Sequence, residues 1–275
     1  MKKITRRSFL AAAGLTAAAL ALTACGGSSS STASSAAASS EAASSSAAAE
    51  LTTVEVGKLT MATNATFPPY EMTTDTGAFE GIDVDTAQAI AEKLGLELQI
   101  DDMEFDAALL SVQQGKADIV MAGVTVTDER KAVMDFSDSY ATGIQSIIVP
   151  EGSDIATPDD LAGKKIGTQR GTTGYIYCSD DFGDENVVAY DSGLTAVQAL
   201  NNGQVDAVVI DNAPAQEYVA ANPGLVVLDT SYAEEDYAIG MAKGSALEDA
   251  INAALEELKA DGTLQSIVDK YITAE

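Results

Sequence analysis

The chain is organised around the stretch Ala122-Gly123-Val124-Thr125-Val126-Thr127-Asp128-Glu129-Arg130, followed by Asp135-Phe136-Ser137. A buried strand at residues 118–123 leads into it. The guanidinium of Arg130 is a permanently charged planar fork that matches a carboxylate with two parallel hydrogen bonds. Gly123 lets a ligand approach the backbone closely, and Thr125 adds an N–H and a hydroxyl. The stretch therefore predicts a site for a small anion at the end of a strand.

A second interpretation of Arg130 stays open at this point. Outside the first 24 residues the only arginines are Arg130 and Arg170. The same local sequence is also compatible with a surface arginine that pairs with Asp128 or Glu129 on a short helix. Such surface ion pairs are common and contribute little to stability.

Upstream of this stretch, short apolar strands alternate with helices. We expect a strand at 58–63, a helix reaching residue 94, a strand at 96–100, a helix at 105–114 and a strand at 118–123. Asp83 is expected to cap the first helix, and Leu109, Leu110 and Val112 to face inward on the second. This β-α-β-α-β order indicates a mainly parallel sheet.

The segment 64–71 contains two prolines, Pro68 and Pro69, and is expected to be a loop without regular structure. It places Asn64, Phe67 and Tyr70 at a strand's carboxyl end, where open α/β sheets hold ligands. Phe67 and Tyr70 either pack in the core or stack on a ligand.

A second α/β unit follows the extended apolar run 143–150. It is expected to contain a capped turn at 157–163, strands at 164–168 and 206–210, a helix opened by Gly171-Thr172-Thr173-Gly174, and a helix at 194–200. The backbone N–H groups at Thr173 offer a second anion site. Asp211 is expected at the end of a strand. Its carboxylate would either pair with an ammonium or cap the helix that follows.

Two extended crossings, near 143–149 and 237–242, bracket this second unit. We therefore expect one lobe from residues 54–142 plus 243–275, with two helices around Gly262. Residues 143–242 then supply the hinge strands and an inserted second lobe, and such a hinge allows closure on a ligand.

The first 24 residues predict a signal peptide. An apolar run at 9–24, which is short for a membrane span, follows four basic residues, Lys2, Lys3, Arg6 and Arg7. Leu22-Thr23-Ala24-Cys25 predicts a lipobox with Cys25 lipidated, and Thr5-Arg6-Arg7-Ser8-Phe9-Leu10 resembles a twin-arginine signal. The export route stays open between the general and the twin-arginine pathway. Residues 25–53, rich in Ser and Ala after the cysteine, predict a flexible tether.

Charge and composition exclude several functions. The chain has 15 basic and 42 acidic residues, and removing the four leader bases leaves 11 against 42, a net charge of −31. This charge disfavours nucleic acid and anionic lipid surfaces as partners. The absence of histidine excludes His-based catalysis and His metal sites. Cys178, unpaired, is expected to pack rather than react.

Three acidic clusters, around 101–104, 180–185 and 234–236, lack the spacing of a calcium loop. We interpret them as solvated faces. We expect no metal and no cofactor.

Seven short motifs occur along the chain in an order and spacing that resemble a known family. They are Phe67-Pro68-Pro69-Tyr70-Glu71, Gly81-Ile82-Asp83-Val84-Asp85, the stretch from Gly123 to Arg130, Asp135-Phe136-Ser137, Asp160-Leu161-Ala162-Gly163-Lys164, Gly171-Thr172-Thr173-Gly174, and Gly203-Gln204-Val205-Asp206-Ala207 with Asp211. In this order and spacing, the chain resembles the periplasmic-type solute-binding proteins of polar amino-acid ABC importers. The resemblance implies a type II periplasmic-binding-protein fold, in which two α/β lobes with parallel or mixed sheets are joined by a two-strand hinge.

The resemblance also implies roles for single residues. Arg130 would hold the ligand's α-carboxylate with the backbone amides of Thr125 and Thr173. Asp211 would hold the ammonium with the carbonyl of Gly123 and the hydroxyl of Thr125. The side chain of the ligand would lie between the remaining pocket residues, which are Phe67, Phe105, Asn64 and Gln169.

The implied function is the extracytoplasmic substrate-binding component of an ABC transporter. It would be a monomer anchored through Cys25 that delivers an L-amino acid to a permease and its ATPase. Family members that select basic amino acids place an acid where this chain has Asn64. Gln169 replaces a lysine, and Ile210 a histidine, of the glutamine-binding pattern. We therefore expect a neutral polar or sulfur-containing ligand, although Arg170 would instead attract an acidic side chain.

Two other functions fit the same fold. One is an exported dehydratase of the cyclohexadienyl type. Such an enzyme needs an acid in the pocket, and the acid expected there, Asp211, is already assigned to the ligand's ammonium. The other is a ligand sensor, for which no effector segment is expected after the last helix. We expect no enzymatic activity.

Overall fold

Two large sheets, a small three-stranded sheet and the helices packed on them make up residues 51–272, the part of the chain that this computed structural model describes. The predicted signal peptide, Cys25 and most of the predicted tether lie outside the described residues. No helix in the described part combines the length and apolarity needed to span a membrane.

The first sheet has the strand order β5-β1-β6-β14-β7. Its strands are β1 (Lys58–Thr63), β5 (Glu97–Asp102), β6 (Ile119–Val120), β7 (Met134–Phe136) and β14 (Gly240–Ala242). β1 pairs in parallel with β5 and β6, whereas β14 runs antiparallel to β6 and β7. The sheet is therefore mixed, and its fourth strand comes from far along the sequence.

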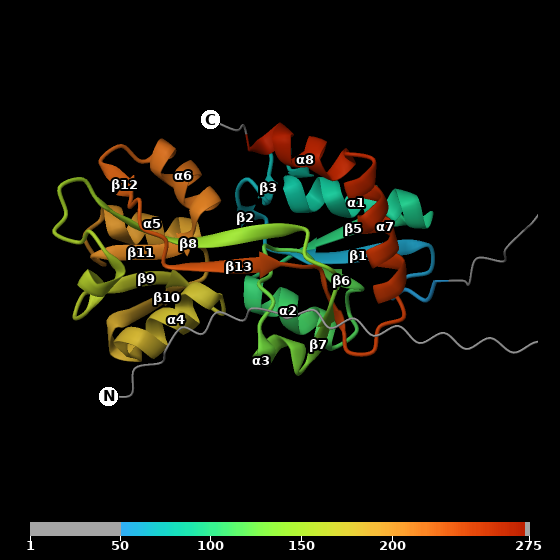
Figure 1. Ribbon diagram of the computed structural model, residues 1–275, viewed down its shortest axis with the longest axis horizontal. Coiled ribbons are helices and arrows are strands. Elements are labelled where there is room, and N and C mark those ends of the chain that lie inside the picture. Colours follow the sequence, from blue (N-terminus) through green and yellow to red (C-terminus); the bar gives the residue numbers. More distant parts are fainter. Residues whose placement is uncertain (1–50, 273–275) are drawn as a thin grey trace, which may run out of the picture. The chain divides into compact units, whose positions relative to one another are not determined.

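Helices cover both faces of the first sheet: α1 (Ile82–Leu94), α2 (Phe105–Gln113), α3 (Asp128–Lys131), α7 (Glu248–Ala260) and α8 (Thr263–Tyr271). In Figure 1, α1, α7 and α8 lie on one side of the sheet and α2 on the other. Two separate cores result, one centred on Met61 and Ile90 and one on Phe105 and Val112. We call this sheet with its helices lobe 1.

The second sheet has the order β10-β9-β11-β8-β12, with β13 also paired to β8. Its strands are β8 (Ala141–Pro150), β9 (Ile166–Gln169), β10 (Val187–Tyr190), β11 (Ala207–Asp211), β12 (Leu225–Val227) and β13 (Ala233–Tyr237). Its helical segments are η1 (Pro158–Leu161), α4 (Thr173–Phe182), η2 (Asp184–Asn186), α5 (Gly193–Asn201) and α6 (Asn212–Ala221). We call this part lobe 2.

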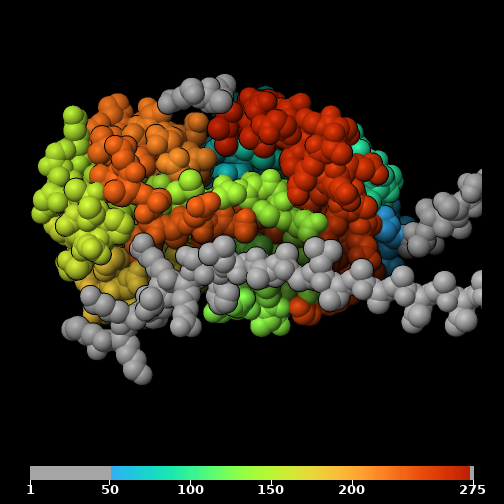
Figure 2. Space-filling model, viewed as in Figure 1, coloured from blue at the N-terminus to red at the C-terminus, as the bar shows by residue number. Residues whose placement is uncertain are grey.

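The long strands β8 and β13 connect the lobes. They pair antiparallel, with Ala141 opposite Tyr237 and Gln145 opposite Ala233. In Figure 1 they run side by side from one lobe to the other, and in Figure 2 their atoms lie at the surface between the helices of the two lobes. The chain passes from the first sheet to the second after β7 and returns after β13. The exact lobe boundaries stay a prediction.

Most predicted elements are present, and four local predictions are wrong. Gly81, not Asp83, is the N-cap of α1, and the Asp83 carboxylate instead accepts hydrogen bonds from Gly123 N–H and the Tyr140 hydroxyl. The strand expected at 118–123 is reduced to β6 (Ile119–Val120), so the loop that carries Gly123 and Thr125 begins directly after Val120. Leu110 is half exposed, because the buried face of α2 follows the spacing Phe105, Ala108 and Val112.

The fourth error concerns the segment 64–71. It is not free of regular structure, since β2 (Thr66–Phe67) pairs with β3 (Glu71–Thr73), and β3 with β4 (Phe79–Glu80). The prolines occupy the turn between β2 and β3, where no ladder hydrogen bond is required. Elsewhere, Cys178 is buried in α4, and this burial raises the pKa of its thiol to about 12. Packing, as predicted, is its role.

Candidate functional site

A cavity of about 300 Å³, including its opening to solvent, lies where the two lobes meet. It is lined by Asn64, Phe67, Glu71, Phe105, Ala122, Gly123, Thr125, Arg130, Gln169, Thr172, Thr173 and Asp211. Every ligand-binding residue predicted from the sequence is in this set. Glu71, Ala122 and Thr172 were not predicted, although Glu71 ends the Phe-Pro-Pro-Tyr-Glu motif.

Arg130 is fixed by backbone carbonyls from both lobes. Its Nη1 donates to the Thr125 carbonyl at 2.7 Å and its Nη2 to the Gly171 carbonyl at 3.2 Å. The guanidinium also lies over the Phe105 ring, 5.4 Å from the centroid. Only 9% of Arg130 is exposed, whereas Asp128 and Glu129 are at the surface, so the interpretation as a surface ion pair is wrong.

The charge of Arg130 faces the cavity with few competing partners. Burial is the main cause that lowers its pKa, but a guanidinium titrates so high that it stays charged. The remaining N–H groups of its fork have no hydrogen-bond partner among residues 51–272. They are thus available to a planar anion.

Asp211 stands at the end of β11, at the N-cap position of α6. Its side chain makes no capping bond and accepts a hydrogen bond from the Tyr237 hydroxyl instead. Burial raises the pKa of Asp211 to about 7; the Tyr237 bond opposes this rise and the nearby charge of Glu235 adds to it. The capping interpretation is therefore wrong for the side chain, which is a buried acid at the cavity wall.

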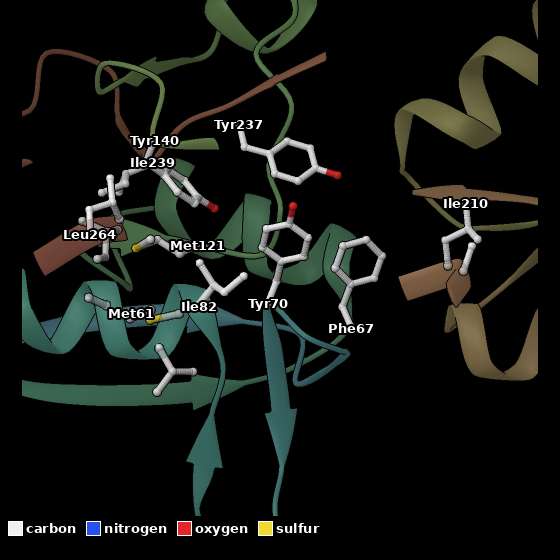
Figure 3. Close-up of a cluster of buried hydrophobic side chains, with 14 of the residues drawn as sticks. Met61, Phe67, Tyr70, Ile82, Met121, Tyr140, Ile210, Tyr237, Ile239 and Leu264 are labelled. Carbon is white, nitrogen blue, oxygen red and sulfur yellow. The ribbon is translucent and has the colours of Figure 1, made fainter. Parts of the chain in front are cut away.

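Gly123 has φ of 55°, in the left-handed region that favours glycine. A Cβ added there would come within 2.9 Å of the Phe67 ring. Phe67 in turn stacks on Tyr70, and Tyr70 packs edge-on against Tyr237. Figure 3 shows these three rings beside one another, with Ile210 of lobe 2 across from them. Phe67 therefore combines both expected roles, in the core and at the cavity, whereas Tyr70 belongs to the core alone.

Asn64 and Gln169 meet across the lobes. Gln169 Nε2 donates to Asn64 Oδ1 at 2.8 Å, and Asn64 Nδ2 donates to the Met103 carbonyl at 2.9 Å. Arg170 is exposed, lies 3.6 Å from Asp191 and does not line the cavity. The structure therefore gives no support to recognition of an acidic ligand side chain by Arg170.

Thr172 and Thr173 bring the N-terminus of α4 to the cavity. The Thr172 hydroxyl accepts the Tyr175 N–H at 3.3 Å and caps the helix. Helix N-termini carry unsatisfied N–H groups and a positive end of the helix dipole. This end of the cavity therefore favours an anion, as predicted for Thr173.

Glu235 is a buried acid behind the cavity that sequence reasoning missed. It was interpreted as part of a solvated acidic cluster, yet it is 6% exposed, while its neighbours Glu234 and Asp236 are at the surface. Its Oε2 accepts hydrogen bonds from the Thr125 and Thr173 hydroxyls and from Gln145 Nε2. The alternation of a strand, with Glu235 and Tyr237 on one face, was the signal that could have found it.

Two further buried acids are Glu71, which lines the cavity, and Asp83, which does not. Glu71 and Asp83 are both buried, and burial raises the pKa of each, for Asp83 to about 6. Asp83 is anchored by Gly123 N–H and by the Tyr140 hydroxyl. Burial is the main cause for Glu71, and the charge of Asp83 raises its pKa further. Asp83 supports the backbone at Gly123.

Comparison with known proteins gives consistent results. The family described as bacterial extracellular solute-binding proteins, family 3, matches residues 59–274. The L-cystine-binding protein TcyJ of Escherichia coli K12 is 34% identical over 226 residues, covering 80% of this chain and 85% of TcyJ. An ancestral arginine-binding protein bound to glutamine is 42% identical, with a TM-score of 0.76 and coverage of 79% and 99%. The same kind of ancestral protein bound to arginine is 43% identical, with a TM-score of 0.75 and coverage of 78% and 98%.

Proposed function

The chain belongs to the bacterial extracellular solute-binding proteins, family 3, and from this premise we propose that it captures a free L-amino acid between its lobes for an ABC transporter. One observation carries the proposal. A single cavity contains a buried arginine with free donors and a buried aspartate without a cationic partner among the described residues. A zwitterion brings one anion and one cation, and each meets its complement there.

Each charged group of the ligand has a proposed set of partners. The α-carboxylate is bound by Arg130 and by the backbone amides of Thr125 and Thr173. The ammonium is bound by Asp211, the Gly123 carbonyl and the Thr125 hydroxyl. The position of Arg130 between carbonyls of both lobes supports this arrangement, because an anion at Arg130 contacts both lobes at once.

The ligand side chain is proposed to lie against Phe67 and Phe105, with the amides of Asn64 and Gln169 beyond. This wall has apolar rings and neutral polar groups. It supports a neutral polar or sulfur-containing amino acid, and the relatives that bind cystine or glutamine agree with that choice.

A basic amino acid is the second candidate, and one observation favours it. The acids Asp211 and Glu235 are buried at or behind the cavity, against the one arginine, Arg130. Buried charge without compensation is costly, so a cationic ligand would gain from this excess. The ancestral relative bound to arginine supports this candidate.

Binding without catalysis suits these residues better than the dehydratase alternative. The relatives described above are named as binding proteins. In this proposal Asp211 is committed to the ammonium. Turnover of prephenate or arogenate by the purified protein would contradict this part of the proposal.

The proposed location follows from the family and the leader. We propose export, lipidation at Cys25, and delivery of the ligand by a monomer to a permease and its ATPase in the membrane. Incorporation of labelled palmitate into the protein, lost in Cys25→Ser, tests the anchor. Equal labelling of the variant would place the lipid elsewhere.

A thermal-shift panel of the purified protein with the common L-amino acids and cystine tests the binding function. A ligand at 100 times its Kd stabilises the protein by about 2.7 kcal/mol. For a domain of this size the expected rise in Tm is about 5–10 °C. No shift with any amino acid, together with no amino acid released from denatured protein in mass spectrometry, would overturn the proposal.

A further inference from the structure

Glu235 lies behind the cavity on β13, one of the two strands that connect the lobes. Three donors converge on one oxygen, Oε2: the Thr125 hydroxyl at 3.1 Å, the Thr173 hydroxyl at 3.0 Å and Gln145 Nε2 at 3.0 Å. Gln145 Nε2 can only donate and both hydroxyls donate here, so Oε2 of Glu235 is the shared acceptor. The other oxygen, Oε1, is buried without a partner among residues 51–272.

The two threonines come from different parts of the molecule. Thr125 follows β6 in lobe 1, and Thr173 opens α4 in lobe 2. Their hydroxyl oxygens are 3.4 Å apart, and both residues line the cavity. One carboxylate oxygen thus holds a hydroxyl from each lobe at the same point.

This arrangement determines which way the hydroxyl protons point. A hydroxyl has one proton and two lone pairs. When the proton of Thr125 is donated to Glu235, or to Thr173 which itself donates to Glu235, only lone pairs of Thr125 remain for the cavity. A hydroxyl held in this way accepts a hydrogen bond from an ammonium and does not donate to a carboxylate.

We propose that Glu235 is a positioning residue that fixes the polarity of the ammonium end of the site, by accepting the hydroxyl protons of Thr125 and Thr173 so that the lone pairs of Thr125 face the ligand's ammonium. This inference rests on the proposed function, binding of a free amino acid. It adds a residue that lies outside the cavity lining and acts through the two hydroxyls.

The test compares ligands that differ only in the ammonium. L-Glutamine is paired with glutaramic acid, and L-arginine with 5-guanidinopentanoic acid, each lacking the α-amino group. Titration calorimetry gives the affinity of each pair for the wild type, for Glu235→Gln and for the control Glu234→Gln. Glu234 is the exposed neighbour on the same strand, so its variant loses the same charge without touching the threonines.

Glu235→Gln is expected to weaken binding of the amino acid about 10- to 100-fold and of the des-amino partner by less than about threefold. An amide oxygen at the position of Oε2 is a weaker acceptor than a charged oxygen, so the hydroxyl protons would be held less firmly away from the ammonium. Glu234→Gln is expected to leave both affinities within about twofold of the wild type. An equal loss for both members of a pair, or no loss at all, would overturn the role of Glu235.

A second pair of variants guards against misfolding of Glu235→Gln. Thr125→Val keeps the side-chain size and removes the hydroxyl that Glu235 orients, so it should produce the same selective loss, and Thr125→Ser, which keeps the hydroxyl, should retain selectivity. No selective loss in Thr125→Val overturns the proposal independently. A wild type that binds neither amino acid nor any other in the panel would instead refute the proposed function, which separates the two failures.

Discussion

Arg130 is held by neutral partners rather than by a carboxylate. The carbonyls of Thr125 and Gly171 and the face of Phe105 orient its guanidinium without neutralising it. An ion pair would have consumed the charge that an incoming anion needs. This difference separates a residue prepared for a ligand from one that stabilises the surface.

Replacing Arg130 is expected to abolish binding while the fold persists. Arg130→Ala and Arg130→Lys should each lose about 2–5 kcal/mol of binding free energy, since a lysine ammonium cannot reproduce the planar fork. Calorimetry with the best ligand of the panel measures the loss. Arg170→Ala is the matched control, because Arg170 is exposed and outside the cavity, and it should bind normally. Unchanged affinity in Arg130→Lys would contradict the assignment.

The pKa of Asp211 predicts how binding depends on pH. Burial raises this pKa to about 7, so Asp211 is increasingly protonated as the pH falls below 7 and loses the charge that holds an ammonium. Affinity for the amino acid should fall by up to about tenfold per pH unit below pH 7 and level off above it. Asp211→Asn should bind weakly and with a flatter profile between pH 5 and 8. An unchanged slope in this variant would assign the dependence to Asp83 or Glu71.

Sequence reasoning predicted the residues that line the cavity better than those that support them. Gly123 and Thr125 follow β6 of the first sheet, Arg130 lies on α3, and Asp211 ends β11 of the second sheet. Strand ends, where α/β sheets hold ligands, can be located from order along the chain. The roles of Asp83 and Glu235 depend on partners about 40 and 110 residues away in the chain. No local pattern contains such partners, so these acids were interpreted as a helix cap and a solvated face.

At the scale of elements, the pairing of β8 with β13 determines how the site is built. Gly143 on β8 lies beneath the ring of Tyr237 on β13, whose hydroxyl donates to Asp211. The same strand, β13, carries Glu235 to the two threonines. A change in this pair of strands therefore affects the ammonium end of the cavity.

Gly143→Ala is expected to disturb this pairing. A Cβ at Gly143 would lie 2.4 Å from Cζ of Tyr237, so the ring must move. We expect a loss of about 1–3 kcal/mol in the free energy of unfolding, measured by urea denaturation, and weaker amino-acid binding. Thr142→Ala changes an exposed neighbour on β8 and should alter neither. Wild-type stability in Gly143→Ala would show that the ring has room to shift.

Most helices and strands could be predicted from the spacing of apolar residues and from the glycines and capping residues at their ends. Gly95 ends α1 with φ of 71°, and the capping box at Thr157 begins η1, both as the sequence indicated. The short strands β2, β3 and β4 were missed, because a strand of two or three residues has no detectable alternation. Leu110 was placed inward because an apolar residue in a short helix does not reveal which face is buried.

At the scale of the whole molecule, hydrogen bonds besides those of Arg130 and Glu235 also join the lobes. The Tyr218 hydroxyl on α6 donates to the Thr66 carbonyl of lobe 1, and Gln169 donates to Asn64. These contacts exist only when the lobes are together. They favour the arrangement in which both lobes contact the ligand.

Removing the Tyr218 contact is expected to weaken binding without altering the site. Tyr218→Phe should lower the apparent affinity about fivefold, because a net hydrogen bond of about 1 kcal/mol no longer favours the competent arrangement. Tyr232→Phe is the matched control, since its hydroxyl bonds Asp181 within lobe 2. That variant should lose stability but keep its affinity, as measured by calorimetry. Equal affinities in the two variants would exclude a contribution of lobe contacts to binding.

The position of β14 has a consequence for the order in which the chain can fold while it is being synthesised from its N-terminus. β14 lies inside the first sheet, between β6 and β7, yet it follows all of lobe 2 in the sequence. When residues 58–136 have emerged, that sheet still lacks an interior strand, and it stays incomplete until residue 242 is out. Every strand of the second sheet, from 141 to 237, is present by then. The lobe that begins second is thus the first to have all of its strands, and lobe 1 is completed only near the end of synthesis.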